Sequence, residues 1–406
     1  MWLTVQAPTD QRPGVYEGSL RVFAGGSGML VPLQVRVLPL KLAEAKPTYG
    51  MYYRHRDQPK AYQTDDFYRR CMADMHAHGM NSMSLYAQVE RKQPDGSWVI
   101  DLENAADPYN TARQITLLTE AGLASADHPL LYLATGKSDG IFGNQERLVA
   151  AVAELRRARG WPELLFYLVD EPGSAARIAL AKELNDIVHR VPGVRTTTAL
   201  GAPGELADYY DVWISSTSSE NLDDILKLGR EKQKEVWTYN CQWNGTQPAN
   251  DRYFCGYHMW VTGLRGNWQW CYTEGYEGSS RLTDEIAWKL PTYEEPWYVN
   301  YVLPTPEGNL PTLGWEGRRE GVDDYRYLQT LREAIAAAPR ARRAQAAAAE
   351  RFLTDAGRRM VAPPQPLPAT NTGRNYGLVM HPGLGPTDYD ALRAQAAEHI
   401  IKLQGR

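Results

Sequence analysis

The sequence has no surplus of one charge. Its 406 residues include 44 Lys and Arg against 48 Asp and Glu, a formal net charge of −4. A general binder of nucleic acids or of anionic membranes would carry a basic surplus, so neither partner is predicted. No run of 18 apolar residues is present, which excludes a membrane-spanning helix. The four cysteines show no CxxC spacing, so neither a disulfide framework nor a structural zinc site is predicted.

Phenylalanine is scarce, with 6 Phe against 12 Trp and 24 Tyr. Trp and Tyr join a flat apolar face to a hydrogen-bonding tip, as half-wet binding surfaces require. Eight of the 12 Trp fall between Trp237 and Trp315. This stretch therefore favours a binding cleft, although some of its tryptophans must belong to the core. High surface exposure or a compositional bias is the competing explanation for the ratio.

Residues 1–44 alternate in the manner of strands. Segments 16–22 and 31–37 flank the turn Gly25–Gly28, which predicts a hairpin. Two or three strands cannot bury a core alone, so we interpret residues 1–44 as a partial β-sandwich. The first five residues lack the basic head and apolar stretch of a signal peptide. Their pattern is typical of the middle of a β-strand, which suggests that upstream sequence is missing. The cellular compartment is therefore not predicted, and a secreted or periplasmic location remains an alternative.

Residues 45–332 alternate short apolar strands with helical patterns, which predicts an α/β fold of the (β/α)8 TIM-barrel type. A doubly wound sheet is the main competitor, but no glycine-rich phosphate loop follows the first strand. We expect a loop over 291–311, a helix from about Asp323, and a helical C-terminal extension over 333–406 with a linker at 363–368 and a last helix at 388–403. The predicted strands are 49–54, 81–87, 130–135, 164–170, 195–200, 211–215, 235–240 and 267–272, separated by helices such as 65–78, 145–159, 175–190 and 221–234.

Asp170 and Glu171 end the apolar run that begins at Leu164, and Pro172 and Gly173 follow them. A strand buried on both faces of a parallel barrel has such a run, and barrel enzymes place catalytic groups at its carboxyl end. Two neighbouring carboxylates suit hydrolysis in which the 2-acetamido group of the sugar attacks its own anomeric carbon. Two solvated acids, one of them capping the next helix, or a metal site remain alternatives.

The pair resembles the catalytic Asp-Glu of glycoside hydrolase family 123, the β-N-acetylgalactosaminidases. Segment 314–328, GWEGRREGVDDYRYL, is similar to the signature W-E-x-x-R-x-G-x-x-D-Y-x-Y-L of that family and its related, uncharacterised group. The resemblance implies a retaining exo-β-N-acetylgalactosaminidase that forms an oxazoline intermediate without a cofactor. It implies that Asp170 orients the acetamido group and that Glu171 is the general acid and base. The expected partner is a glycan with a terminal β-linked N-acetylhexosamine.

Further site residues are expected around this pair. His76 and His78 have a metal-like spacing, but histidines two apart on a helix face different directions, so no metal is predicted. Glu316 and Arg319 either pin the C-terminal segment by a salt bridge or reach the sugar. A conventional retaining glycosidase of the β-galactosidase type and a non-catalytic carbohydrate-binding barrel remain alternatives. The predicted substrate-binding residues are Tyr86, Tyr239, Asn240, His258, Trp260, Trp268, Trp270, Trp315, Glu316 and Arg319.

Overall fold

The fold comes from a computed structural model of the chain. Its contacts divide the chain into two units, which are treated separately: residues 45–323 and 361–382 form one, and residues 1–44, 324–360 and 383–406 form the other. The predicted linker at 363–368 lies outside the described residues. The structure describes residues 3–8, 10–58, 62–87, 89–104, 107, 109–134, 145–216, 222–240, 248–273, 301–305, 308–361 and 383–405.

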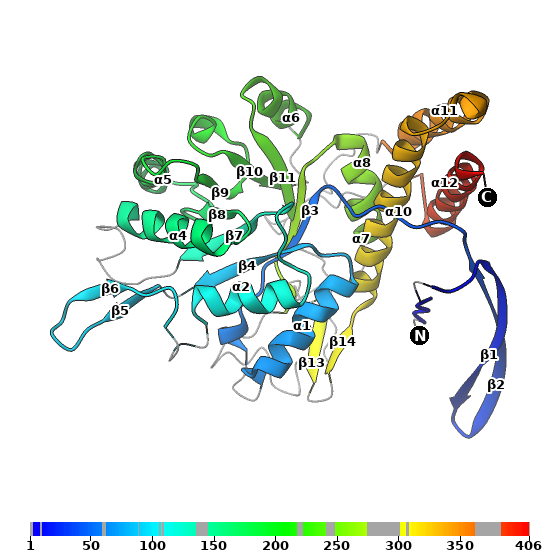
Figure 1. Ribbon diagram of the computed structural model, residues 1–406, viewed down its shortest axis with the longest axis horizontal. Coiled ribbons are helices and arrows are strands. Elements are labelled where there is room, and N and C mark those ends of the chain that lie inside the picture. The colour runs from blue at the N-terminus through cyan, green and yellow to red at the C-terminus, as the bar shows by residue number, and fades with distance from the viewer. Residues whose placement is uncertain are drawn as a thin grey trace, which may run out of the picture. The chain divides into compact units, whose positions relative to one another are not determined.

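The larger unit contains a closed barrel of eight parallel strands, which confirms the predicted (β/α)8 fold (Figure 1). Each strand pairs with the next barrel strand along the chain, and the last one, β12, pairs with the first, β3, which closes the barrel. The strands are β3 (Thr48–Met51), β4 (Ser82–Ala87), β7 (Leu130–Ala134), β8 (Leu164–Tyr167), β9 (Arg195–Leu200), β10 (Val212–Ser216), β11 (Glu235–Asn240) and β12 (Gly266–Gln269).

Helices surround these strands (Figure 1). Polar residues fix where several of them begin: the side chains of Thr64, Asn110 and Ser174 each accept a hydrogen bond from a backbone N–H of the first turn. Two small hairpins, β5–β6 (Glu90–Lys92, Trp98–Ile100) and β13–β14 (Val302–Thr305, Gly308–Pro311), interrupt the βα alternation. The helices are α1 (Asp65–Ala77), α2 (Thr111–Glu120), α4 (Gln145–Arg159), α5 (Ala175–Val188), α6 (Leu222–Glu231), α7 (Pro248–Tyr253), η4 (Phe254–His258), α8 (Met259–Thr262) and α10 (Leu313–Ala336).

Alternation along the strands selects the side chains that fill the barrel. Trp237 and Trp268 lie in a lower interior layer, where their rings stack with centroids 6.1 Å apart. Gly50 makes room for Trp268 and Gly266 makes room for Trp237, because a Cβ at either position would overlap the indole. Two residues further along the strands lies the upper aromatic layer, which we define as Tyr52, Tyr86, Tyr167, Tyr239 and Trp270. This layer is the floor of the carboxyl-end mouth of the barrel.

Helix α10 begins at Leu313, so the expected start near Asp323 is wrong, and the β13–β14 hairpin occupies part of the expected loop. Glycine disfavours helices, and Gly317 and Gly321 therefore obscured the start in the sequence. Both glycines have a packing role instead. A Cβ at Gly317 would overlap the Pro248 carbonyl of α7, and one at Gly321 would overlap the Arg252 carbonyl. The glycines allow α10 to approach α7 and η4 backbone to backbone.

The smaller unit contains the predicted N-terminal hairpin, as strands β1 (Gly14–Ala24) and β2 (Ser27–Val37), which pair in an antiparallel two-stranded sheet. It also contains the end of α10, α11 (Arg343–Met360) and α12 (Pro386–Gln404). Arg393 of α12 holds the fully buried carboxylate of Asp324 at 2.6 Å. The main-chain carbonyl of Glu44 accepts a 2.6 Å hydrogen bond from Gln329. Polar contacts thus join the N-terminal segment to the C-terminal helices.

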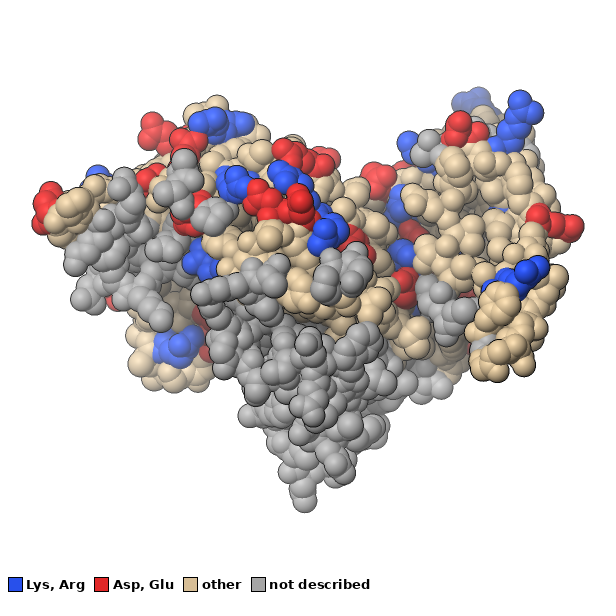
Figure 2. Space-filling model, turned by 90° about the horizontal axis from the view of Figure 1, so that it is seen from below, with Lys and Arg blue, Asp and Glu red and all other residues tan. Residues whose placement is uncertain are grey.

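Charges at the amino end of the barrel are paired. Arg195 at the start of β9 contacts Glu163 at 2.7 Å and Glu235 at 2.6 Å. On the face shown in Figure 2, acidic and basic side chains lie side by side instead of forming a patch of one sign. Among the described residues, no helix has both the length and the apolar character needed to cross a bilayer.

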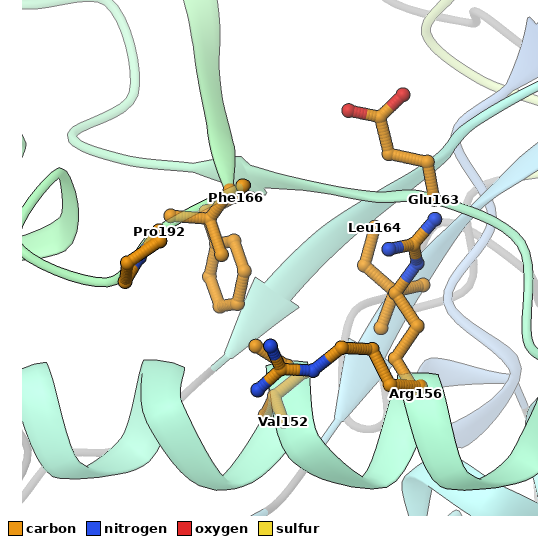
Figure 3. A pocket seen from close by; sticks show the side chains of 10 residues that line it. Val152, Arg156, Glu163, Leu164, Phe166 and Pro192 are labelled. Carbon is orange, nitrogen blue, oxygen red and sulfur yellow. The ribbon is translucent and has the colours of Figure 1, made fainter.

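A cavity of about 190 Å³ lies between α4 and the outer side of the barrel (Figure 3). Val152 and Arg156 of α4 face Leu164 and Phe166 of β8 across it, and Pro192 closes one side. Leu164 and Phe166 alternate with the inward-facing Leu165 and Tyr167 and therefore point to the helices. The cavity is outside the barrel mouth and is not part of the site described next.

Candidate active site

The chain turns sharply where it leaves β8. Val169 and Glu171 have φ angles of 48° and 44°, in the left-handed region that β-branched residues rarely adopt. Such conformations persist only where the surroundings enforce them, and they gather at functional sites. Here Thr198 donates to the Val169 carbonyl at 2.8 Å, and Tyr210 donates to the Leu168 carbonyl at 2.7 Å. This strained turn carries the two neighbouring carboxylates.

Each carboxylate accepts a hydrogen bond from its own tyrosine of the upper aromatic layer. The Tyr167 hydroxyl donates to Oδ1 of Asp170 at 2.5 Å, and the Tyr239 hydroxyl donates to Oε1 of Glu171. Tyr167 belongs to β8 and Tyr239 to β11, three strands further round the barrel. The Asp170 side chain is therefore held at the β8 wall, while Glu171 reaches across the mouth. Both carboxylates are exposed.

Burial sets the protonation state of Tyr167. Burial, the charges of Tyr52 and Asp170, and its hydrogen bond to Asp170 hold the pKa of Tyr167 well above its ordinary value. The hydroxyl therefore stays protonated at neutral pH and acts as a donor to Asp170. The Ala199 N–H donates to the Tyr167 hydroxyl oxygen at 3.1 Å and fixes the position of this hydroxyl. Arg177 of α5 donates to the Asp170 carbonyl, so the backbone of the turn is held as well.

The floor of the mouth is aromatic. Tyr52 contacts Trp270 and Tyr167, with ring centroids 5.6 and 6.2 Å apart. The Arg54 guanidinium lies 4.6 Å from the Tyr86 centroid and 4.9 Å from the Trp270 centroid, in cation–π geometry. Pyranose rings offer apolar faces that stack on aromatic rings, while tyrosine hydroxyls can bind sugar oxygens. The floor has the chemistry of a carbohydrate site.

Four predicted site residues lie in or directly beneath this floor. Tyr86, Tyr239 and Trp270 belong to the upper aromatic layer. Trp268 lies one layer lower and is fully buried, and its ring centroid is 5.3 Å from that of Tyr52. Asn240 ends β11 and pairs in register with Gln269, which places its backbone at the mouth.

Sequence reasoning missed Tyr52, Arg54 and Tyr167. Tyr52 directly follows the first barrel strand, β3, Arg54 comes two residues later, and Tyr167 ends the strand that leads to the carboxylates. Their positions at the carboxyl ends of barrel strands were the available signal, because active sites of this fold lie there. All three, however, lie within the predicted strands 49–54 and 164–170, where a side chain is expected to belong to the core.

His258 and Trp260 lie in the helical segment between β11 and β12. His258 is buried, with its ring stacked on Phe254 at 5.8 Å. Burial lowers the pKa of His258 to about 4, so the ring is neutral at physiological pH. The structure thus places these two residues in the outer helical layer and does not bring them to the carboxylates.

Trp315 and Glu316 of α10 contact Asp74 and His78 at the end of α1, and Arg319 pairs with Glu316; we call this set of contacts the clasp. Asp74 of α1 accepts hydrogen bonds from Trp315 Nε1 at 2.9 Å and from Tyr272 at 2.7 Å. His78 lies between two carboxylates, 3.3 Å from Asp74 and 3.6 Å from Glu316. Arg319 then pairs with Glu316 at 2.6 Å. These contacts account for the three residues as a structural link between two helices.

The clasp is charged. Burial by itself lowers the pKa of His78, but the nearby carboxylates of Asp74 and Glu316 outweigh burial and raise this pKa to about 9. His78 is therefore a cation at neutral pH, enclosed by Asp74, Glu316 and the stacked Trp315 ring at 4.6 Å. In the described part of the chain, no three His, Cys, Asp or Glu side chains are grouped so that they could hold a metal ion.

Comparison with known proteins gives fold-level likeness only. No family model and no curated protein matches the chain. Three solved structures are similar to this chain. A β-galactosidase from the psychrophilic Marinomonas ef1 has 10% identity and a TM-score of 0.43, covering 71% of this chain and 60% of that one. A GH113 β-1,4-mannanase has 11% identity and a TM-score of 0.39 (69% of this chain, 98% of that one), and a fungal endo-β-N-acetylglucosaminidase of family 18 has 12% identity and a TM-score of 0.34 (58% of this chain, 93% of that one). The chain thus spans about 60% of the β-galactosidase.

Proposed function

We propose that the protein is a retaining exo-β-N-acetylgalactosaminidase. The observation that carries the proposal is the neighbouring carboxylates of Asp170 and Glu171, each hydrogen-bonded by its own tyrosine above an aromatic floor. The resemblance of this pair and of segment 314–328 to glycoside hydrolase family 123 supports the choice of sugar. The substrate is a glycan that ends in β-linked N-acetylgalactosamine.

The reaction proceeds in two steps and uses the acetamido group of the substrate as the nucleophile. In the first step the acetamido carbonyl oxygen attacks the anomeric carbon, the glycosidic bond breaks, and Glu171 gives its proton to the leaving oxygen. In the second step Glu171 takes a proton from water, which attacks the same carbon and opens the oxazoline. Two inversions give net retention.

Asp170 is the orienting group in this scheme. Its carboxylate accepts the acetamido N–H and stabilises the positive charge that develops on the amide during attack. The Tyr167 hydroxyl fixes one oxygen of that carboxylate. An acceptor that is already positioned does not need to reorganise as the charge forms, which is how an electrostatic contribution lowers a barrier.

The first test uses three nitrophenyl glycosides: β-N-acetylgalactosaminide, β-N-acetylglucosaminide and β-galactoside. The proposal predicts cleavage of the first and none of the galactoside, because the galactoside lacks the acetamido nucleophile. Cleavage of the galactoside alone would support a conventional retaining glycosidase instead. Sugar binding without cleavage of any substrate would identify a carbohydrate-binding barrel.

The second test assigns the roles. Glu171→Gln should abolish turnover of substrates with poor leaving groups and spare activated nitrophenyl substrates more, since these need less protonation. Asp170→Asn should impair both kinds of substrate. The matched controls Glu205→Gln and Asp208→Asn remove exposed carboxylates that pair with Lys182 and Lys232 and should leave turnover unchanged. If Glu171→Gln leaves both substrate kinds untouched, Glu171 is not the acid.

A further inference from the structure

Tyr52 is the first residue after β3 and part of the upper aromatic layer. Its side chain is only 4% exposed. Its ring packs against Tyr167, Trp268 and Trp270, with centroids 5.3 to 6.2 Å away. The ring is therefore fixed in the floor of the mouth, directly beside the tyrosine that holds Asp170.

The Tyr52 hydroxyl is buried and makes no hydrogen bond within the described structure. The neighbouring Tyr167 hydroxyl lowers the pKa of Tyr52, but the two hydroxyls do not meet the geometry of a hydrogen bond. The Tyr167 hydroxyl donates to Asp170 instead and accepts from the Ala199 N–H. Other buried tyrosines of the barrel have partners: Tyr49 donates to the Cys255 carbonyl at 2.6 Å, and Tyr132 bonds Thr111 at 3.0 Å. Buried polar groups without a partner are rare in native proteins, and each one requires an explanation.

The charges around Tyr52 indicate what it can bind. Burial raises the pKa of Tyr52 well above its ordinary value, and electrostatic interactions with Tyr86 and with the carboxylates of Asp170 and Glu171 raise it further. The hydroxyl is therefore a neutral donor at physiological pH. The two carboxylates would repel an anion at this position, so the fitting acceptor is an uncharged oxygen.

We propose that Tyr52 is a specificity-determining residue whose hydroxyl donates a hydrogen bond to a ring hydroxyl of the bound sugar. This inference rests on the proposed function, which assigns the acetamido group to Asp170 and leaves the ring hydroxyls to other donors. The substrate supplies the partner that the folded protein lacks. A site built to pair a substrate hydroxyl discriminates strongly against an analogue without it, because the protein group is then left unpaired.

The first experiment needs no ligand and compares Tyr52→Phe with Tyr132→Phe in thermal unfolding. Tyr132→Phe removes a hydroxyl that bonds Thr111 and should lower Tm, since the Thr111 hydroxyl then loses a buried partner. Tyr52→Phe removes only an unpaired hydroxyl, so its Tm should equal or exceed that of the wild type. If Tyr52→Phe lowers Tm as much as Tyr132→Phe does, the hydroxyl already has a partner and the inference is overturned.

The second experiment measures kcat/KM on nitrophenyl β-N-acetylgalactosaminide and on its 3-, 4- and 6-deoxy analogues. Tyr52→Phe should lower kcat/KM for the parent about tenfold or more, while Tyr132→Phe should not change it. On one deoxy analogue, wild type and Tyr52→Phe should be equally active, which identifies the bonded hydroxyl. An undiminished rate on the parent, or the same loss on every analogue, would overturn the inference.

The proposed function and this inference can fail separately. If the wild type cleaves none of these sugars, the hydrolase proposal fails, and Tyr52 is then judged from the Tm shift on adding N-acetylgalactosamine. A rise in wild type that Tyr52→Phe loses supports a sugar contact at Tyr52. An equal rise in both proteins, or no rise in either, overturns it.

Discussion

Replacing His78 by Gln should remove a pH-dependent part of the stability of the barrel. The groups that face His78 are Asp74 on its own helix, Glu316 on α10 and the Trp315 ring; Arg319 is the partner of Glu316. Its side chain is 6% exposed, so solvent screens these charges little. The protonated ring is held by two carboxylates, and a neutral Gln at this position cannot replace its charge.

The magnitude follows from the pKa of His78, which rises from 6.5 to about 9 on folding. A difference of one unit corresponds to about 1.4 kcal/mol, so protonated His78 contributes about 3 kcal/mol to the free energy of unfolding. Because the folded pKa is the higher one, this contribution is complete below pH 6.5 and is lost as the pH rises through about 9.

The assay is urea unfolding of wild type and His78→Gln from pH 6 to pH 10. The difference between the free energies of unfolding of wild type and His78→Gln should shrink by about 3 kcal/mol over this range. The other titrating groups are present in both proteins, so their contributions cancel in this difference. His55→Gln is the control: burial lowers the pKa of His55 to about 4, so the corresponding difference should be constant above about pH 7.5. Between pH 6 and that value it should change only slightly, in the direction opposite to that of His78→Gln. A constant difference for His78→Gln would refute the charged clasp.

Three further predictions concern packing and the site. Gly321→Ala should lower the free energy of unfolding by about 1–3 kcal/mol, because the added Cβ would overlap backbone atoms. The control Gly357→Ala in α11, where a Cβ meets open space, should raise it by about 0.5–1 kcal/mol. Equal effects of the two substitutions in chemical unfolding would contradict this packing. Gln233→Gly should raise the free energy of unfolding by about 0.5–1 kcal/mol, because Gln233 follows α6 with a φ of 55°, a backbone conformation that glycine adopts more easily. A lower Tm of this variant would contradict the prediction. Tyr239→Phe should lower kcat more than it raises KM, because the Tyr239 hydroxyl donates to Glu171; steady-state kinetics showing only a higher KM would instead support the predicted contact of Tyr239 with the sugar.

The barrel could be predicted because its strands are recognisable locally. Arg195–Leu200 and Glu235–Asn240 have the predicted bounds, since both are short segments rich in β-branched or aromatic residues between clear helical patterns. Asp170 and Glu171 could be singled out for the same reason: charged residues that end an apolar run mark the carboxyl end of a buried strand.

The clasp and the floor could not be predicted in the same way. Trp315 and Glu316 meet Asp74 and His78, which are far away in the sequence, and no local pattern indicates such a pairing. Whether a tyrosine is core or site depends on where its hydroxyl lies. Tyr52 and Tyr132 are indistinguishable in the sequence, and only their three-dimensional surroundings separate them.

The most direct test of the central claim is a rate series in which the acetamido group of nitrophenyl β-N-acetylgalactosaminide carries one, two or three fluorine atoms. Fluorine makes the amide oxygen a poorer nucleophile without changing the leaving group. If the substrate attacks its own anomeric carbon, kcat/KM of the wild type should fall steeply with each added fluorine. A series that stays flat would contradict substrate-assisted hydrolysis at Asp170 and Glu171.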